Sequence, residues 1–241
     1  MLGFKSFLES INIKDDSVEI DYSSPDGLLK TTMGKNKSKE PYVMTYKGYQ
    51  IFSSYIKDSS ALNTDIMNAL KGKSTDLNID PQVLSQFIKR TAIHLWLTSI
   101  KNKSIDMIVS IKSSSSLAND FASEFFSRIP NVYFLPDSAF KGGKENIKID
   151  DKASEGQKKS ITRAINKEGE FQIKKIDAKM RNLVHGYMSI SDELQSKIEG
   201  KNILIVDDFL TSGATLKDIF DTVSKYNPKS IYGVTIFKAR K

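Results

Sequence analysis

The sequence predicts an α/β fold in which a parallel sheet is flanked by helices, and two observations carry this prediction. Short apolar runs, of the kind that buried parallel strands show, recur along the second half of the chain. Helical patterns separate these runs, and such alternation is typical of a parallel sheet with crossover helices. We expect strands at 105–111, 132–135, 203–206 and 230–237, and helices at 114–128 and 214–226.

The first hundred residues carry a mixed pattern. The aromatic and β-branched segment 41–57 predicts a hairpin that turns at Lys47-Gly48. Asp80 is a natural N-cap and Pro81 a natural first-turn residue of a long helix, in which His94 is interpreted as structural. The other expectations are a short helix within 2–11, a turn-rich loop over 23–40 and a short helix at 61–70. We assign residues 1–100 to an N-terminal extension that packs on a core domain, 101–241.

The composition suits a folded chain and excludes several kinds of site. Of the 241 residues, 39% are hydrophobic and none is cysteine, which excludes disulfides, thiolate metal sites and cysteine nucleophiles. A net charge of +7 suits an anionic small substrate and leaves nucleic acid open as a secondary partner. No apolar stretch approaches the ~20 residues of a membrane span, and the N-terminus lacks the apolar region of a signal peptide. We therefore expect a cytoplasmic protein without a membrane partner.

The segment 203–216, ILIVDDFLTSGATL, has the composition of a ligand-binding unit. Four apolar residues end in Asp207 and Asp208, a loop of small residues follows, and a helix begins at the end of the loop. Ligands of parallel sheets bind beyond the carboxyl ends of the strands. Gly213 allows a close backbone approach, and the loop amides and helix N-terminus suit a phosphate. The acids would repel a phosphate and suit vicinal ribose hydroxyls. A solvated acidic turn would explain any one of these residues, but not the whole run.

This segment resembles the signature with which type I phosphoribosyltransferases bind phosphoribosyl pyrophosphate (PRPP), and it matches that pattern at every position. The resemblance implies a Rossmann-type sheet of that family over 105–237. It implies that Asp207 and Asp208, the candidate catalytic residues, hold the ribose 2- and 3-hydroxyls. It also implies Mg²⁺, held mainly by oxygens of PRPP and by water and not directly by the protein. The implied 5-phosphate ligands are Thr211, Ser212, Gly213, Ala214 and Thr215.

The family also has a diphosphate-binding loop after an earlier strand. Its match here is the serine-rich segment that follows the strand expected at 105–111. The implied diphosphate-binding residues are Ser110, Lys112, Ser113 and Ser114. A serine-rich N-cap of the next helix is the alternative interpretation of these serines.

The polar, lysine-rich segment 136–180 predicts a long flexible insertion. The resemblance implies that it is a lid, which closes over PRPP and excludes water. The candidate lid residues are Lys158, Lys159, Arg163 and Arg181, and a solvated run of charges is the alternative for each. The order of Gln172, Arg181, Asn182 and Gly186 is similar to that in the competence-protein-F-like branch, although Arg181 and Asn182 are adjacent here, which departs from its spacing.

The predicted reaction is transfer of a 5-phosphoribosyl group from PRPP to a nitrogenous base, with release of diphosphate. No general base is assigned. One alternative is a non-catalytic protein that senses PRPP and binds nucleic acid, in a regulatory or competence-related role. Another is an enzyme similar to PRPP synthetases. The expected partners are PRPP and a nucleobase-like acceptor, and the resemblance is compatible with a homodimer.

Overall fold

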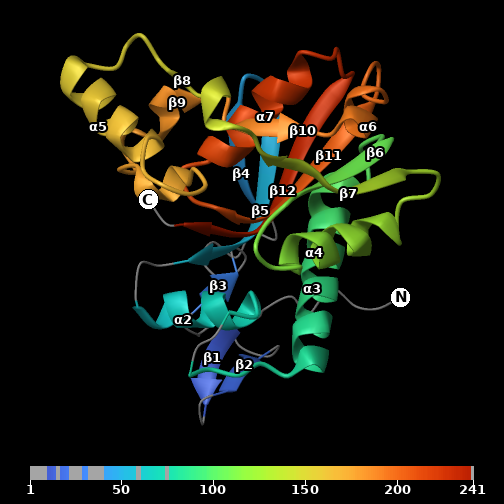
Figure 1. Cartoon of the computed structure of the whole chain (residues 1–241). Coiled ribbons are helices and arrows are strands. Elements are labelled where there is room, and N and C mark those ends of the chain that lie inside the picture. The colour runs from blue at the N-terminus through green and yellow to red at the C-terminus, as the bar shows by residue number, and fades with distance from the viewer. Residues whose placement is uncertain are drawn as a thin grey trace.

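The computed structural model describes residues 10–14, 17–21, 29–31, 41–57, 61–73 and 76–239. Within these ranges a ten-stranded sheet with a parallel centre runs through the molecule, and helices lie on both of its faces (Figure 1). The predicted α/β class is confirmed. The parallel strands lie in the order β7 (Tyr133–Lys141), β6 (Met107–Ile111), β11 (Asn202–Leu210), β12 (Ser230–Ala239) and β5 (Tyr49–Lys57).

Antiparallel strands extend the sheet at both ends. β10 (Met188–Ile190) pairs with β7 at one end. The strands at the other end are β4 (Tyr42–Tyr46), β3 (Leu29–Thr31), β1 (Ser10–Lys14) and β2 (Ser17–Asp21). A separate pair is formed by β8 (Lys148–Ile149) and β9 (Val184–His185). The α-helices are α2 (Ala61–Leu70), α3 (Pro81–Leu95), α4 (Leu117–Phe126), α5 (Glu155–Ile165), α6 (Asp192–Gln195) and α7 (Ala214–Ser224).

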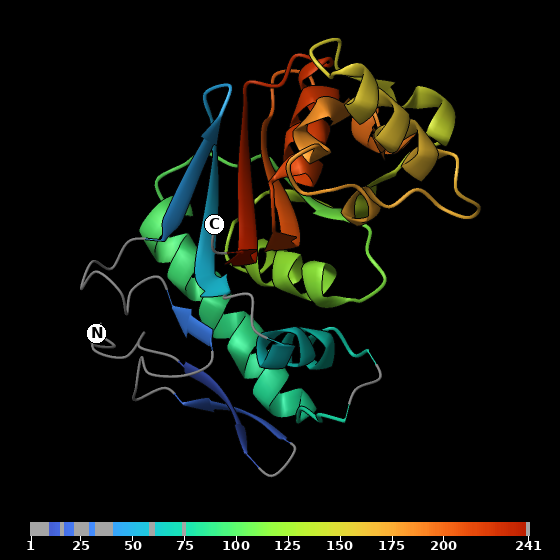
Figure 2. The same cartoon turned by 90° about the vertical axis from the view of Figure 1, so that its left-hand side faces the viewer.

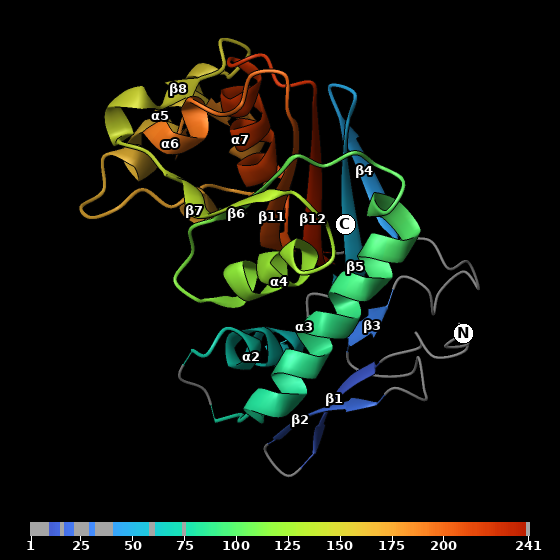
Figure 3. The ribbon, with the colours of Figure 1, turned by 90° about the vertical axis from the view of Figure 1, so that its right-hand side faces the viewer.

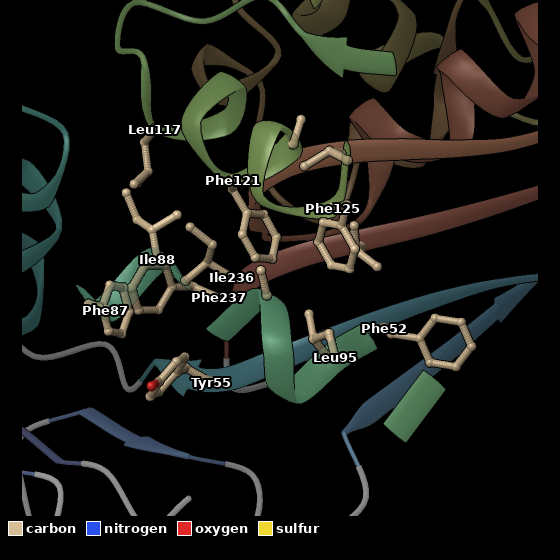
Figure 4. Packing of buried hydrophobic residues seen from close by; sticks show 14 of the residues in the cluster. Phe52, Tyr55, Phe87, Ile88, Leu95, Leu117, Phe121, Phe125, Ile236 and Phe237 are labelled. Atoms are coloured by element: carbon tan, nitrogen blue, oxygen red, sulfur yellow. The ribbon is translucent and has the colours of Figure 1, made fainter. Parts of the chain in front are cut away.

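Two apolar cores lie on the two faces of the sheet. On one face α3 and α4 cover the strands, and Phe87, Phe121 and Phe125 pack with Ile236 and Phe237 of β12 (Figures 3 and 4). On the other face the buried side chains of α7 pack on β11. Burial of these large apolar side chains is the main stabilising contribution to the fold.

The connections between the parallel strands reverse direction at one point. From β6 the chain crosses through α4, on the first face, to β7; from β11 it crosses through α7, on the opposite face, to β12. β6 and β11 are neighbours, so the two crossovers leave them in opposite directions. Such a switch point separates the loops that follow the two strands and creates the usual ligand site of open parallel sheets.

The N-terminal hairpin belongs to the central sheet. The turn at Lys47-Gly48 is confirmed, with φ of 49° and 86°, and it joins β4 to β5. β5 pairs in parallel with β12 from Gln50 to Lys57. The sequence predicted an extension packed on a core that begins at residue 101. In the structure, strands from before and after residue 101 belong to the same sheet.

Two helices expected in the first half, at 61–70 and from Asp80 onward, are confirmed. The predicted helix at 61–70 is α2, and Asp80 caps α3 by accepting a hydrogen bond from the backbone N–H of Gln82 at 2.7 Å. α3 continues into a π-helical turn, Trp96–Ile100. His94 is buried, with its Nδ1 2.9 Å from the hydroxyl of Ser54, as suits a structural residue.

The segment 136–180 has regular structure, where the sequence predicted a long loop. It contains the end of β7, the short strand β8 and helix α5, which is capped by Ser154. Ile161, Phe171 and Ile176 are buried in the core that α7 covers. We refer to residues 142–187, which leave and rejoin the sheet at Lys141 and Met188, as the lid segment.

Two expectations lie mostly outside the described residues. Of the helix expected within 2–11, only residues 10 and 11 are described, and they belong to β1. Of the loop expected over 23–40, only β3 is described. None of the described helices is both long and apolar enough to cross a bilayer.

Candidate functional site

Asp207 and Asp208 lie inside β11, which continues to Leu210 instead of ending at Val206 as predicted. β6 pairs with β11 only as far as Val206, whereas β12 continues alongside and its Thr235 pairs with Asp207. Asp207 and Asp208 are only 8% and 5% exposed. Two buried adjacent carboxyl groups need compensating partners, because burial of charge is costly.

The two acids face opposite sides of the sheet. Successive side chains of a strand alternate between its faces. Leu204 and Val206 belong to the core under α3 and α4, and Ile203 and Ile205 belong to the core under α7. By the same alternation, Asp208 continues the first row and Asp207 the second.

The partner of Asp208 comes from the N-terminal part of the chain. The ammonium of Lys71, the residue that follows α2, lies 2.7 Å from Oδ2 of Asp208. Figures 1 and 2 show α2 (teal) and α5 (yellow) on opposite sides of the end of β12. The sequence did not single out Lys71, because nothing in its neighbourhood distinguishes it from the other lysines.

Asp207 has no cation as close as that of Asp208. Burial and then the negative charge of Asp208 raise its pKa to about 7, while the backbone N–H of Asp208 and the charge of Lys71 act in the opposite direction. That N–H donates to Oδ1 of Asp207 at 2.8 Å. The pair therefore carries less negative charge near neutral pH than two independent carboxylates would.

The loop after β11 forms a helix N-terminus open to a ligand. Gly213 adopts φ of 77° and precedes α7, and the N–H of Ala214 donates to the hydroxyl of Ser212 at 3.3 Å. A side chain on Gly213 would come within 2.7 Å of the terminal methyl of Met44 in β4. Thr211 is exposed, and Ser212 and Thr215 are half-buried. The backbone amides and hydroxyls of this loop and the positive end of the helix dipole suit a phosphate here.

Helix α7 also holds the end of the lid segment. The buried carboxylate of Asp218 accepts hydrogen bonds from the backbone N–H groups of Gly186 and Met188, at 2.6 and 2.7 Å. Burial raises the pKa of the Tyr187 phenol, and a hydrogen-bonding contact with Thr215 opposes this effect. The phosphate-loop helix and the lid segment are thus joined by buried polar contacts.

The loop after β6 lies beside the loop after β11, because Ser110 is paired with Val206 in the parallel register. Ser110 itself is fully buried: its hydroxyl donates to Asn119 and accepts from the N–H of Asp137. Lys112, Ser113 and Ser114 are exposed. Three of the four expected diphosphate-binding residues are therefore accessible, and the side chain of Ser110 positions the loop.

The four candidate lid residues do not form a single cluster. On α5, Lys159 and Arg163 are exposed, and the ammonium of Lys158 lies 3.5 Å from Glu155 one turn away. Arg181 uses its guanidinium within the lid segment, where it donates to the carbonyl oxygens of Ile176 and Lys174 at 2.9 and 3.1 Å. Arg181 thus forms hydrogen bonds between two parts of the lid segment.

Comparison with known proteins decides the family. The family model of the phosphoribosyl transferase domain matches residues 82–241, about two thirds of the chain. The chain belongs to this family. Its parallel sheet with flanking helices is the type I phosphoribosyltransferase fold, as predicted. Both Lys71 and Met44 lie before the matched region.

Several individual proteins are similar to this chain. A hypoxanthine-guanine phosphoribosyltransferase of Dictyostelium discoideum is 32% identical over 56 residues, which cover 23% of this chain and 31% of that one. An adenine phosphoribosyltransferase structure is 16% identical, with a TM-score of 0.37, over 66% of this chain and 71% of the other. The adenine phosphoribosyltransferase of Thermoanaerobacter pseudethanolicus is 15% identical, with a TM-score of 0.36, over 66% and 82%.

Proposed function

We propose that this protein transfers the 5-phosphoribosyl group of PRPP to a nitrogenous base and releases diphosphate. The observation that carries the proposal is the position of the two candidate loops. They follow neighbouring strands, β6 and β11, on either side of the switch point of the sheet. Anion-binding groups and a pair of carboxylates are thereby placed together where open parallel sheets bind ligands.

Each part of PRPP has a matching chemical group at this site. The loop 211–215 and the N-terminus of α7 receive the 5-phosphate. Asp207 and Asp208 accept hydrogen bonds from the ribose hydroxyls, and Lys112 with its neighbouring serines faces the diphosphate. The reaction then depends mainly on positioning and on electrostatic stabilisation of the departing diphosphate.

Mg²⁺ is the expected cofactor, and the donors present fit an ion carried by the substrate. Among the described residues there is no group of three or more acidic, histidine or cysteine side chains placed to hold a metal. The site instead offers two carboxylates and several hydroxyls, beside room for phosphate oxygens. Mg²⁺ prefers oxygen ligands and keeps several waters, so PRPP and water would supply most of its shell. When bound, the ion neutralises charge on the diphosphate.

Two measurements test the proposal. Isothermal titration with PRPP and Mg²⁺ should give saturable binding that Asp207→Asn and Asp208→Asn weaken. Diphosphate release should then appear with at least one base of a panel that begins with hypoxanthine, guanine and adenine. Absence of turnover with every base would contradict the transferase.

Binding of PRPP without turnover would favour the alternative of a PRPP sensor that contacts nucleic acid. In that case DNA or RNA affinity should depend on PRPP and fall steeply with salt concentration. Formation of PRPP from ribose 5-phosphate and ATP would instead identify the synthetase-like alternative.

A further inference from the structure

Lys71 is held in place firmly enough to act as part of a site. The last turn of α2 is anchored by four buried residues, Ile66, Met67, Ala69 and Leu70. Beyond it, the N–H of Lys71 donates to the carbonyl of Met67 at 3.2 Å and that of Lys73 to Asn68 at 2.9 Å. Gly72, with φ of 63°, ends the helix. The backbone at Lys71 is therefore fixed by the packing of α2 and by the hydrogen bonds that cap its C-terminus.

The ion pair of Lys71 differs from ordinary surface pairs. Its two side chains are 21% and 7% exposed, and their charged atoms are 2.7 Å apart. Exposed ion pairs contribute little because water screens them, whereas a nearly buried carboxylate depends strongly on its partner. The contact is an ion pair and not an aligned hydrogen bond, because Oδ2 of Asp208 is buried without a hydrogen-bond partner. The ammonium of Lys71 has three N–H donors.

Binding of an anionic substrate such as PRPP requires the positive charge of Lys71 beside Asp208, for an electrostatic reason. The ligand carries several negative charges, and its diphosphate is attached next to the ribose hydroxyls that the acids would bind. Without Lys71, those charges would approach two adjacent carboxyl groups, one of which already has a pKa raised by burial and by its neighbour. A cation on Asp208 lowers this repulsion and leaves donors for an oxygen of the ligand.

We propose that Lys71 is a positioning residue of the PRPP site, which holds and neutralises Asp208 so that the acid pair binds ribose hydroxyls beside an anionic diphosphate. This inference rests on the proposed function. It makes the segment before residue 82, outside the matched family region, a necessary part of substrate binding.

Titration of PRPP with Mg²⁺ into Lys71→Met, Lys71→Gln and Lys71→Arg tests the inference. The two uncharged variants should weaken PRPP binding at least tenfold, roughly what one charge-assisted hydrogen bond contributes. Lys71→Arg keeps the charge and should remain within about threefold of the natural protein. Lys73→Met, two residues further on at an exposed position, is the matched control and should leave affinity unchanged.

A second comparison separates a positioning role from a structural one. In the background of Asp208→Asn, Lys71→Gln should have much less effect on PRPP affinity, because the charge that it compensates has gone. A thermal melt checks that each variant is folded, and Lys71→Gln, whose uncharged amide can still donate a hydrogen bond to Asp208, is the second variant should Lys71→Met unfold.

The outcomes distinguish this inference from the proposed function. If the natural protein does not bind PRPP at all, the proposed function fails. If the natural protein binds PRPP and Lys71→Gln binds it equally well or more tightly, Lys71 is no positioning residue and the inference is overturned. An equal loss in the natural and Asp208→Asn backgrounds would also overturn it.

Discussion

Asp207 and Asp208 are adjacent on β11, yet their surroundings are built by different parts of the chain. Asp208 lies toward the side of α2 and pairs with Lys71, before the matched family region. Asp207 lies toward the side of α7, where Thr215, Asp218 and the end of the lid segment are all within the matched region. One half of the site is therefore built by the family domain and the other half by residues that precede it.

Replacement of each acid has the largest expected effect and tests this contrast directly. Asp207→Ala and Asp208→Ala should each lower kcat/KM for PRPP about 100-fold, because each removes a charged hydrogen-bond acceptor for the ribose. Steady-state diphosphate release measures the loss. A variant that retains full activity would contradict the assignment of its acid to the ribose.

Unfolding without PRPP should separate the same two variants. Asp208→Ala leaves Lys71 without its partner and should lower the free energy of unfolding by roughly 2 kcal/mol, less than for a fully buried pair because Lys71 is 21% exposed. Asp207→Ala removes a carboxyl whose charge burial disfavours, but it also removes the acceptor of the Asp208 N–H, so it should cost less than Asp208→Ala. Equal losses in urea denaturation would contradict the contrast.

The junction of the lid segment on the α7 side should be nearly as sensitive. Gly186 adopts φ of 75°, and a side chain there would collide with the carbonyl oxygen of Asn146. Gly186→Ala should therefore cost about 3 kcal/mol in unfolding free energy. Gly156→Ala in α5, where nothing lies within 4 Å, is the control and should be neutral or slightly stabilising. Similar losses for both would refute the close packing at Gly186.

Asp218→Asn tests the contacts between α7 and the lid segment. The amide retains one acceptor oxygen and turns an NH₂ toward an N–H donor, so it should cost about 1–3 kcal/mol. Asp221→Asn, which affects a more exposed contact with Lys47, should cost less than about 1 kcal/mol. Chemical denaturation of the two variants gives the comparison, and a larger loss for Asp221→Asn would argue against it.

The smallest effect concerns the pH dependence of the free protein. The pKa of Asp207 is about 7 in the fold, above its value of about 4 in the unfolded chain. Its favourable contribution is therefore complete below about pH 4 and is lost as the pH rises toward 7. Relative to Asp207→Asn, the natural protein should lose about 1 kcal/mol or more over this range in urea titrations. A constant difference from pH 4 to 8 would contradict the raised pKa.

The parts of the fold that the sequence predicted are those with a local signal. β6, β11 and β12 are short continuous apolar runs, and α3 has a capping residue, Asp80, that the structure confirms. The small-residue loop after β11 was predicted from its composition. The extension of β11 through Asp207 and Asp208 was not, because burial of two acids depends on distant partners.

The position of β5 inside the sheet could not be predicted, because its polar residues interrupt the apolar pattern that indicates a buried strand. Ser53 and Ser54 lie in the middle of five successive buried residues. Ser53 is satisfied by Thr235 at 2.6 Å and Ser54 by His94 at 2.9 Å, both distant in the sequence. The pattern indicates a hairpin but carries no information on its pairing with β12.

The regular structure of the lid segment and the ion pair of Lys71 were missed for similar reasons. Ile161, Phe171 and Ile176 stand singly among lysines and acids, so they produce no helical or strand periodicity although all three are buried. Lys71 acquires its role only when α2 packs against the end of β11. Such contacts depend on tertiary structure and leave no pattern along the chain.

The parallel pairing of β5 with β12 has a consequence for proteolysis. A fragment that retained only residues 82–241 would lose β5 and expose the backbone of β12 from Tyr232 to Ala239. Most residues of that strand are buried, and they include the apolar residues Ile231, Val234, Ile236 and Phe237. Long apolar edges recruit strands from other chains, so the fragment should aggregate even though it spans the whole matched domain. The N-terminal hairpin therefore covers this edge and prevents it from pairing with strands of other molecules.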